Sequence, residues 1–310
     1  MGLKDKLRGT PVLGTALTVH ERYTEDLGNH LAASIAFFTV LSIFPLMLLG
    51  LSVAGYVLAD DPTAQEAFLM RMARGVPGLR AALGDTLEAT LDTIVDNRGV
   101  AGAVGLLGVL FAGLRVIDGA KDATSVVYRS ENRANPLVKK LESLFALIVL
   151  GLLFVAGAFA SGAVGLAGDA ATSIGIPPEV TGVVRLTAPL VGFALDLAFF
   201  VLAYRLLSAG AGPPWRDLWA GAALAAVGWG ALKTFGAAYV GSQAAQWNGL
   251  YGALGGVIAL MLLLFLAGRI YVYGAELNAV RRERRTDHGT VGHEPAVEEP
   301  PDLSPWQRAG

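Results

Sequence analysis

The sequence predicts an all-α fold, a polytopic membrane helical bundle with six transmembrane helices and further amphipathic helices at the membrane surface. Composition is the first reason: 54% of the 310 residues are hydrophobic and 16% are charged, whereas soluble domains carry roughly 25% charged residues. The second reason is that the apolar residues gather in long runs, and ~20 such residues suffice to cross a bilayer core of ~30 Å. The third is an uneven distribution of Lys and Arg among the connections.

Three parts of the chain differ in composition. An amphipathic segment at 1–30 precedes a membrane domain at 31–280, and a Pro- and Glu-rich tail at 281–310 has no apolar periodicity, so it is predicted to be disordered. Within the membrane domain, we expect spans at 31–58, 100–117, 141–166, 183–207, 216–240 and 249–279.

Two segments outside the spans have amphipathic patterns. In residues 1–30, leucines recur on one helical face, which predicts a helix along the cytoplasmic membrane surface. A soluble helix packed on the bundle fits the same pattern. The loop at 60–98 has two apolar stripes separated by Pro77 and Gly78, which predicts two extracytoplasmic helices at the interface. They would form a cap on the bundle or a lid over a cavity, and the cap is the simpler interpretation.

The basic residues predict the orientation. The connection at 119–140 and the start of the tail are rich in Lys and Arg, while the connections at 168–182 and 241–249 contain neither. Basic loops stay in the cytoplasm. Six spans with both termini in the cytoplasm therefore satisfy the short loops. The arginines of 60–98 oppose this assignment, although that loop also carries many acids.

Small residues mark the surfaces on which we expect helices to pack. Glycine lets two backbones approach closely, either within the bundle or in a homo-oligomer. The predicted packing glycines are Gly102, Gly105, Gly108, Gly252 and Gly256. Pro45 lies in the middle of the first span, where it removes a backbone hydrogen bond and is predicted to kink the helix.

Ionisable residues within the predicted spans are the candidate substrate site. Asp196, Lys233 and Arg269 lie in three different spans, and Tyr273 and Glu276 follow Arg269 on the same helical face. A charge at mid-bilayer costs ~2.5–3.5 kcal/mol on insertion scales, so each needs a partner or a function. One interpretation is a buried salt bridge from Asp196 to Lys233 or Arg269 that holds the bundle. Another is a polar cavity that binds or passes an anionic group, and a third is snorkelling of the long side chains.

The sequence offers little for catalysis. It has no cysteine and only four histidines, which are scattered over the N-terminal segment and the tail. We therefore predict no metal, no cofactor, no catalytic residue and no enzyme activity. The chain contains no GxxxxGK[ST] motif, so it should not hydrolyse ATP itself. A formal net charge of −2 gives no bias toward nucleic acid.

Several blocks resemble one family of bacterial inner-membrane proteins, the YihY/BrkB family. They are LAASIAFFTVLSIFPLMLL at 31–49, NRGVAGAVGLLGVLFAGLRVIDGAKDATSVVYR at 97–129, YRLLSAGAGPPWRDLWAGAALAAVGW at 204–229 and YGALGGVIALMLLLFLAGRIYVYGAELNA at 251–279. The YGALGGVIAL and GAELNA blocks are the specific ones. The resemblance implies six spans with cytoplasmic termini and roles in envelope integrity and serum resistance. It also implies a tRNA-processing activity, since the family has carried the label ribonuclease BN.

Three functions follow as hypotheses. The first is a transporter, exporter or lipid translocase for an anionic substrate, with the bilayer and an anionic lipid or small molecule as partners. The second is a non-transporting membrane scaffold or envelope-integrity factor, in which small-residue faces build an oligomer. The third is a ribonuclease, which the scattered histidines and the lack of a basic groove with stacking aromatics disfavour.

Overall fold

The computed structural model describes residues 10–57, 93, 97–130, 135–173, 178–208, 213–236 and 253–290. Its regular elements within these ranges are helices. They are α2 (Pro11–Glu25), α3 (Gly28–Val57), α7 (Arg98–Val127), α8 (Pro136–Ser173), α9 (Pro178–Leu206), α10 (Trp215–Ala231), the π-helix η2 (Leu232–Gly236) and α12 (Ala253–Thr290).

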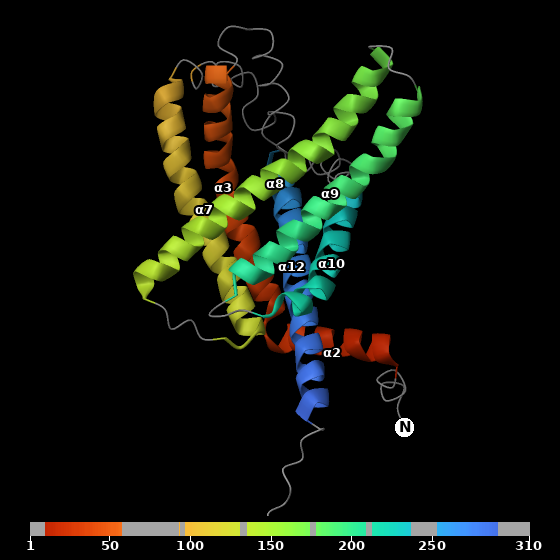
Figure 1. Cartoon of the computed structure of the whole chain (residues 1–310). Helices are drawn as coiled ribbons and strands as arrows, with labels where there is room; N and C mark the ends of the chain where they lie inside the picture. The colour runs from red at the N-terminus through yellow and green to blue at the C-terminus, as the bar shows by residue number, and fades with distance from the viewer. Residues whose placement is uncertain are drawn as a thin grey trace, which may run out of the picture.

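Among the described residues, six helices are long and apolar enough to cross a membrane, which confirms the predicted fold class. They are α3, α7, α8, α9, α10 together with η2, and α12. Figure 1 shows that successive spans run in alternating directions. As a result, α2, the last turns of α7, α9 and α12, and the first turns of α8 and α10 all lie toward one end of the bundle, which we call the α2 end (Figure 1).

The glycines of α7 form its contact with α3. A Cβ on Gly105 would lie 2.6 Å from the Leu49 backbone nitrogen, and one on Gly108 would lie 2.6 Å from the Pro45 Cβ. Gly102 faces the Ser52 side chain in the same way. The two backbones can therefore approach along this seam only because these positions lack side chains. Pro45 lies inside α3, on this seam.

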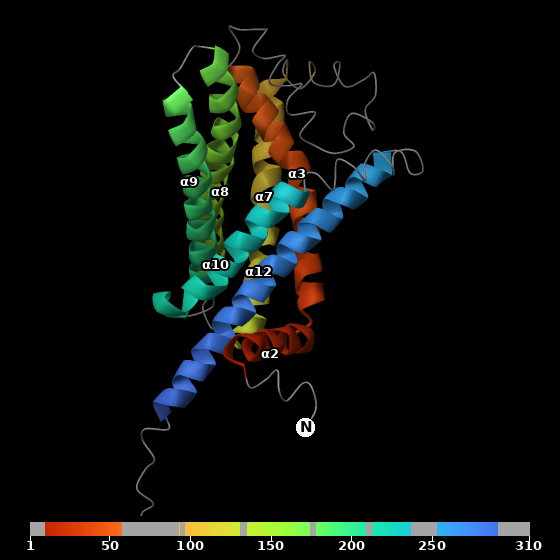
Figure 2. The same cartoon turned by 90° about the vertical axis from the view of Figure 1, so that its right-hand side faces the viewer.

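Helix α12 holds the bundle together. It packs against α2, α3, α7 and α10, and Figure 2 shows it crossing the molecule diagonally between them. Its contact with α10 is the tightest, because a Cβ on Gly221 would overlap the Gly274 carbonyl oxygen. At the same place the Asn278 Oδ1 accepts a hydrogen bond of 2.7 Å from the Gly221 amide. Tyr204 donates its hydroxyl proton to the Tyr271 carbonyl at 2.8 Å.

Helix α2 lies across the end of the bundle, roughly perpendicular to the spans (Figure 2). Val19, Arg22 and Tyr23 are buried, and the helix packs on α12 and α3. The leucine stripe predicted for this segment takes part in the packing only in part, because Leu31 packs against the core whereas Leu13 and Leu27 remain exposed. The segment thus packs on the bundle by one face and leaves apolar side chains on another.

Several helices extend beyond the predicted spans: α8 runs from Pro136 to Ser173, α9 begins at Pro178, and α7 and α12 continue past their predicted ends. Helix α7 continues past 117 to Val127, where Thr124 is buried and donates a hydrogen bond of 2.7 Å to the Leu207 carbonyl. Helix α12 continues past 279 to Thr290, so the first ten residues of the tail predicted as disordered are helical. A tertiary contact stabilises this extension of α12, because Arg285 forms an ion pair with the buried Asp217 of α10. Residues 291–310, and the loop predicted at 60–98 apart from 93, 97 and 98, lie outside the described residues.

Substituting Gly221 by alanine should strongly destabilise the bundle. The new methyl group has no room against the Gly274 carbonyl, and such overpacking typically costs about 1–3 kcal/mol. Unfolding in mixed detergent micelles would measure the loss. Gly230→Ala is the matched control on the same helix, since a Cβ there would meet nothing within 4 Å. That variant should be neutral or more stable by up to about 1 kcal/mol. Equal effects of the two substitutions would contradict the tight α10–α12 contact.

Candidate functional site

The five predicted site residues do not share one cavity. Asp196 and Lys233 line a cavity inside the bundle, Arg269 and Tyr273 line a separate groove between α10, η2 and α12, and Glu276 is fully buried beneath α2. The spacing along one helix sets which residues share a face, but only packing decides which neighbour meets that face. The expectation of a single site is therefore corrected to three.

Asp196 and Lys233 form an ion pair. The Lys233 Nζ lies 2.6 Å from the Asp196 Oδ2 and donates a hydrogen bond to it. Asp196 comes from α9 and Lys233 from the π-helix η2 that ends the fifth span. The two side chains differ in exposure, 12% for Asp196 and 36% for Lys233. The ammonium group is therefore the more accessible member of the pair.

This ion pair borders a cavity of about 400 Å³. Helices α3, α7, α8, α9, α10 and α12 all contribute to its wall, which is mainly apolar. Thr39 and Ser42 of α3 add hydroxyl groups, although each already donates to a backbone carbonyl of its own helix. The cavity has the size and the few polar groups that are common in small-molecule sites.

Arg269 has aromatic rather than acidic neighbours. Its Cζ lies 5.8 Å from the ring centroids of Tyr23 and Phe265 and 5.9 Å from that of Tyr273. The two tyrosine rings are stacked at 4.0 Å, and the Tyr273 hydroxyl lies 3.0 Å from the His20 Nδ1. Burial raises the pKa of the Tyr23 phenol, so its hydroxyl stays protonated at neutral pH. Of the two cations considered as partners of Asp196, Lys233 forms the ion pair.

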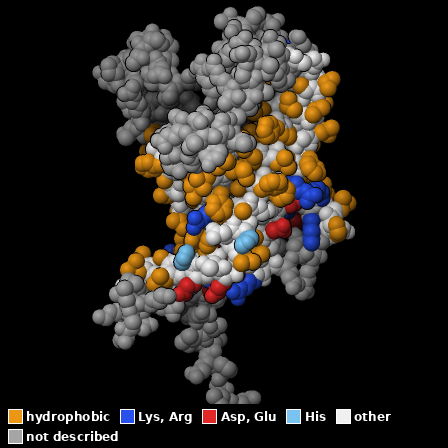
Figure 3. Space-filling view, turned by 180° about the vertical axis from the view of Figure 1, so that it is seen from behind, with side chains coloured by type: hydrophobic (Ala, Val, Ile, Leu, Met, Phe, Trp, Pro, Cys, Tyr) orange, Lys and Arg blue, Asp and Glu red, His pale blue; other side chains and the backbone are white. Residues whose placement is uncertain are grey.

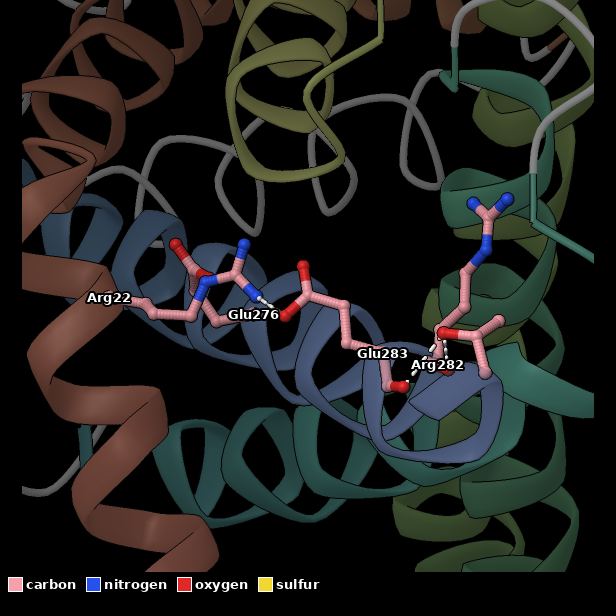
Figure 4. A network of polar contacts seen from close by, with 5 residues as sticks. Arg22, Glu276, Arg282 and Glu283 are labelled. Atoms are coloured by element: carbon pink, nitrogen blue, oxygen red, sulfur yellow. Dashed lines mark hydrogen bonds and ion pairs between the residues drawn. The ribbon is translucent and has the colours of Figure 1, made fainter. Parts of the chain in front are cut away.

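Glu276 belongs to a buried charge cluster with Arg22 of α2, which Figure 4 shows from close by. The Arg22 Nε lies 3.7 Å from the Glu276 Oε2, and its other end bonds the Glu283 Oε2 at 2.6 Å. Glu276 is 0% exposed, whereas Glu283 is 58% exposed. One arginine from α2 thus bridges two carboxylates that lie about two turns apart on α12. Sequence reasoning missed Arg22, because the residue lies in an ordinary polar segment far from Glu276 in the chain.

Charged side chains gather toward the α2 end of the molecule, as Figure 3 shows for the rear face, while hydrophobic side chains cover the part above them. Within the described residues, no group of three or more His, Cys, Asp or Glu side chains is placed to hold a metal ion.

The family model described as virulence factor BrkB matches residues 19–299. The chain belongs to the BrkB family. The GAELNA block has a structural reason in this family member: Gly274 lets α10 approach, Glu276 meets Arg22, and Asn278 accepts a hydrogen bond from the Gly221 amide. These residues serve the packing of α12.

Similar proteins carry names of different kinds. The inner membrane protein YhjD of Escherichia coli (strain K12) is 26% identical over 87% of this chain and 82% of its own length. The putative ribonuclease-like protein YfkH of Bacillus subtilis (strain 168) is 25% identical over 85% of this chain and 94% of its own. A UPF0761 membrane protein of Vibrio campbellii is 26% identical over 85% and 81%. No solved structure gives a significant match. The protein is therefore a membrane protein of the BrkB/UPF0761 type.

Of the predicted packing glycines, Gly102, Gly105 and Gly108 face α3. Gly252 lies outside the described residues, and Gly256 lies in the first turn of α12, where only the helical backbone is described.

Replacing Arg22 by glutamine should destabilise the protein by about 3 kcal/mol, because it removes the arginine that forms an ion pair with the buried Glu276. The double variant Arg22→Gln, Glu276→Gln should recover most of this loss, since it removes both charges. Glu283→Gln is the control: it removes the exposed carboxylate on the same arginine and should cost less than about 1 kcal/mol. Detergent unfolding measures all three. No recovery in the double variant would show that the Arg22 contacts matter for a reason other than charge.

Proposed function

We propose that this BrkB-family protein is a transporter, exporter or lipid translocase whose substrate is an amphipathic molecule with an anionic head. The cavity between the spans, with the Asp196 and Lys233 pair in its wall, is the observation that carries the proposal. A cavity inside a transmembrane bundle is a natural place for a substrate to pass. Ionisable residues that face such a cavity mark substrate pathways in many transport proteins.

The preference for an anion follows from the geometry of the ion pair. Lys233 is three times as exposed as Asp196, at 36% against 12%. A negative group that enters the cavity can therefore reach the ammonium without displacing the carboxylate. The less exposed Asp196 carboxylate neutralises the Lys233 ammonium while the cavity holds no substrate.

The apolar wall explains why the substrate should be amphipathic. Apart from the ion pair and the two α3 hydroxyls, the cavity is lined mainly by aliphatic and aromatic side chains, among them Phe154, Phe199 and Trp229. A fully hydrated polar solute would lose its water there without gaining partners, which is costly. A molecule with a hydrocarbon body and a single charged head avoids that cost.

We further propose the orientation in which the α2 end faces the cytoplasm of a bacterial inner membrane. The basic connection at 119–140 and the arginines at the end of α12 belong to this end (Figure 1). Basic segments next to spans stay in the cytoplasm.

The scaffold hypothesis has less support. It relied on small-residue faces that could build an oligomer, but Gly102, Gly105 and Gly108 contact α3 of the same chain. The described part of the glycine-rich surface is therefore already occupied within the protomer.

Removal of the positive charge should stop transport, and removal of the negative charge should not. The assay uses proteoliposomes with fluorescent phosphatidylglycerol or phosphatidylcholine and follows the movement of each lipid by dithionite quenching. Wild type should move the anionic lipid faster. Lys233→Gln should lose this activity by about tenfold or more, the scale of one charge-assisted hydrogen bond. Asp196→Asn should retain it.

The double variant Asp196→Asn, Lys233→Gln separates function from folding. It replaces the ion pair by two neutral amides, so it should fold like wild type and still fail to transport. A double variant that transports normally would contradict the substrate role of Lys233 and leave the pair a purely structural one. A wild type that moves neither lipid would contradict the lipid-translocase form of the proposal.

A further inference from the structure

A second hollow, outside the central cavity, runs between α10, η2 and α12. Its volume is about 570 Å³. Apolar side chains of both helices line most of its length, including Phe235 of η2 and Leu263 and Leu266 of α12. Arg269 and Tyr273 lie at the end nearest to α2. The groove is thus apolar along its body and cationic at one end.

Arg269 is the unusual member of this groove, because no acidic partner compensates its charge within the described part of the chain. Its neighbours there are the rings of Tyr23, Phe265 and Tyr273, and the hydroxyl groups of the two tyrosines also interact with its guanidinium group. Its Nε is buried and has no hydrogen-bond partner among the described residues. The other charges of the candidate site are paired, Lys233 with Asp196 and Glu276 with Arg22. A buried, uncompensated guanidinium nitrogen calls for an anion.

The length of the groove matches one leaflet of a membrane. Arg269 lies ten residues after Ala259, the lining residue of α12 farthest from α2. At 1.5 Å per residue these positions are ~15 Å apart along the helix. The hydrocarbon core of a bilayer is ~30 Å thick, so half of it is also ~15 Å. Arg269 and Tyr273 therefore fall at the depth of a head group when the apolar body of the groove lies at the depth of the acyl chains.

We infer that this groove binds one acidic phospholipid from the leaflet at the α2 end. The lipid phosphate accepts hydrogen bonds from the Arg269 guanidinium and lies next to the Tyr273 hydroxyl, and one acyl chain runs along Leu266 and Leu263. This lipid stays bound, and it does not pass through the cavity that holds Lys233. The inference does not rest on the proposed transport function.

The head group, not the chain, decides which lipid binds. An acyl chain in the groove exchanges one apolar environment for another, because bilayer tails are as apolar as the leucines that line it. The phosphate gains charge-assisted hydrogen bonds at a site partly shielded from water, where such bonds are strongest. Acidic lipids should therefore be preferred over zwitterionic lipids with the same chains. The cytoplasmic leaflet, in which the proposed orientation places the groove, is the one rich in acidic lipids.

Native mass spectrometry of the full-length protein in detergent tests this site. Phosphatidylglycerol and phosphatidylcholine with identical chains are titrated separately. We expect one tightly bound phosphatidylglycerol in wild type and weaker binding of phosphatidylcholine. Arg269→Gln should weaken phosphatidylglycerol binding by about tenfold or more. Arg281→Gln is the matched control: it removes an exposed arginine from the same helix and should leave the tight site intact.

A second pair of variants keeps Arg269 and tests the groove itself, in case Arg269→Gln does not fold. Leu266→Trp places a bulky side chain in the groove and should also weaken binding of phosphatidylglycerol. Leu224→Trp adds the same side chain at an exposed position of α10 and should not. Equal affinity for the two lipids, or unchanged phosphatidylglycerol binding in folded Arg269→Gln or Leu266→Trp, would overturn the inference. So would glycerol 3-phosphate binding as tightly as the lipid, because the groove would then contribute nothing.

The experiments can contradict the lipid site without contradicting the transport proposal, and the reverse. Lys233→Gln should reduce transport and keep the bound phosphatidylglycerol, while Leu266→Trp should lose the bound lipid without altering the Asp196 and Lys233 pair. A bound lipid that disappears in Lys233→Gln but persists in Arg269→Gln would assign it to the central cavity and would contradict the groove site.

Discussion

The close contact between α10 and α12 is the constraint on which the rest of the structure depends. Gly221 and Gly274 let the two backbones meet, and Asn278 fixes their register by accepting the Gly221 amide proton. Helix α12 is then placed where α2, α3 and α7 can pack on it. The apolar surfaces of membrane helices gain little from burial against each other, because lipid tails are equally apolar. Close backbone approach and specific hydrogen bonds must therefore hold this bundle together, and glycine supplies the first.

The charged residues divide into groups by the partners that surround them. Arg22 of α2 bridges Glu276 and Glu283, and Arg285 reaches Asp217 of α10, so both sets of ion pairs fasten elements to the end of α12. The ion pair of Asp196 and Lys233 borders the central cavity instead. Arg269 differs from all of these because aromatic rings surround it in place of acids. The partner that each charged side chain meets, and not its position in the sequence, therefore distinguishes these groups.

The two hollows suit complementary roles in one membrane protein. The central cavity, lined by residues of six helices, suits the proposed transport substrate, and the groove beside α12 suits the proposed bound lipid. Both are bordered by the short π-helix η2, which carries Lys233 toward the cavity and Phe235 toward the groove. π-Helical turns are frequent at functional sites, since the wider turn redirects side chains that a regular α-helix would place elsewhere.

The sequence by itself determined the class of the protein, its six spans and its family, because apolar runs of sufficient length have few alternatives to a membrane helix. It also singled out the glycines of the second span, whose spacing leaves one smooth face. It did not determine that α12 would continue to Thr290 or that Glu276 would be buried, since both depend on Arg22 and Asp217 from distant parts of the chain. Nor did it divide the five candidate residues among three places. Helical periodicity fixes the face of a residue, but the helix that covers that face is chosen by packing in three dimensions.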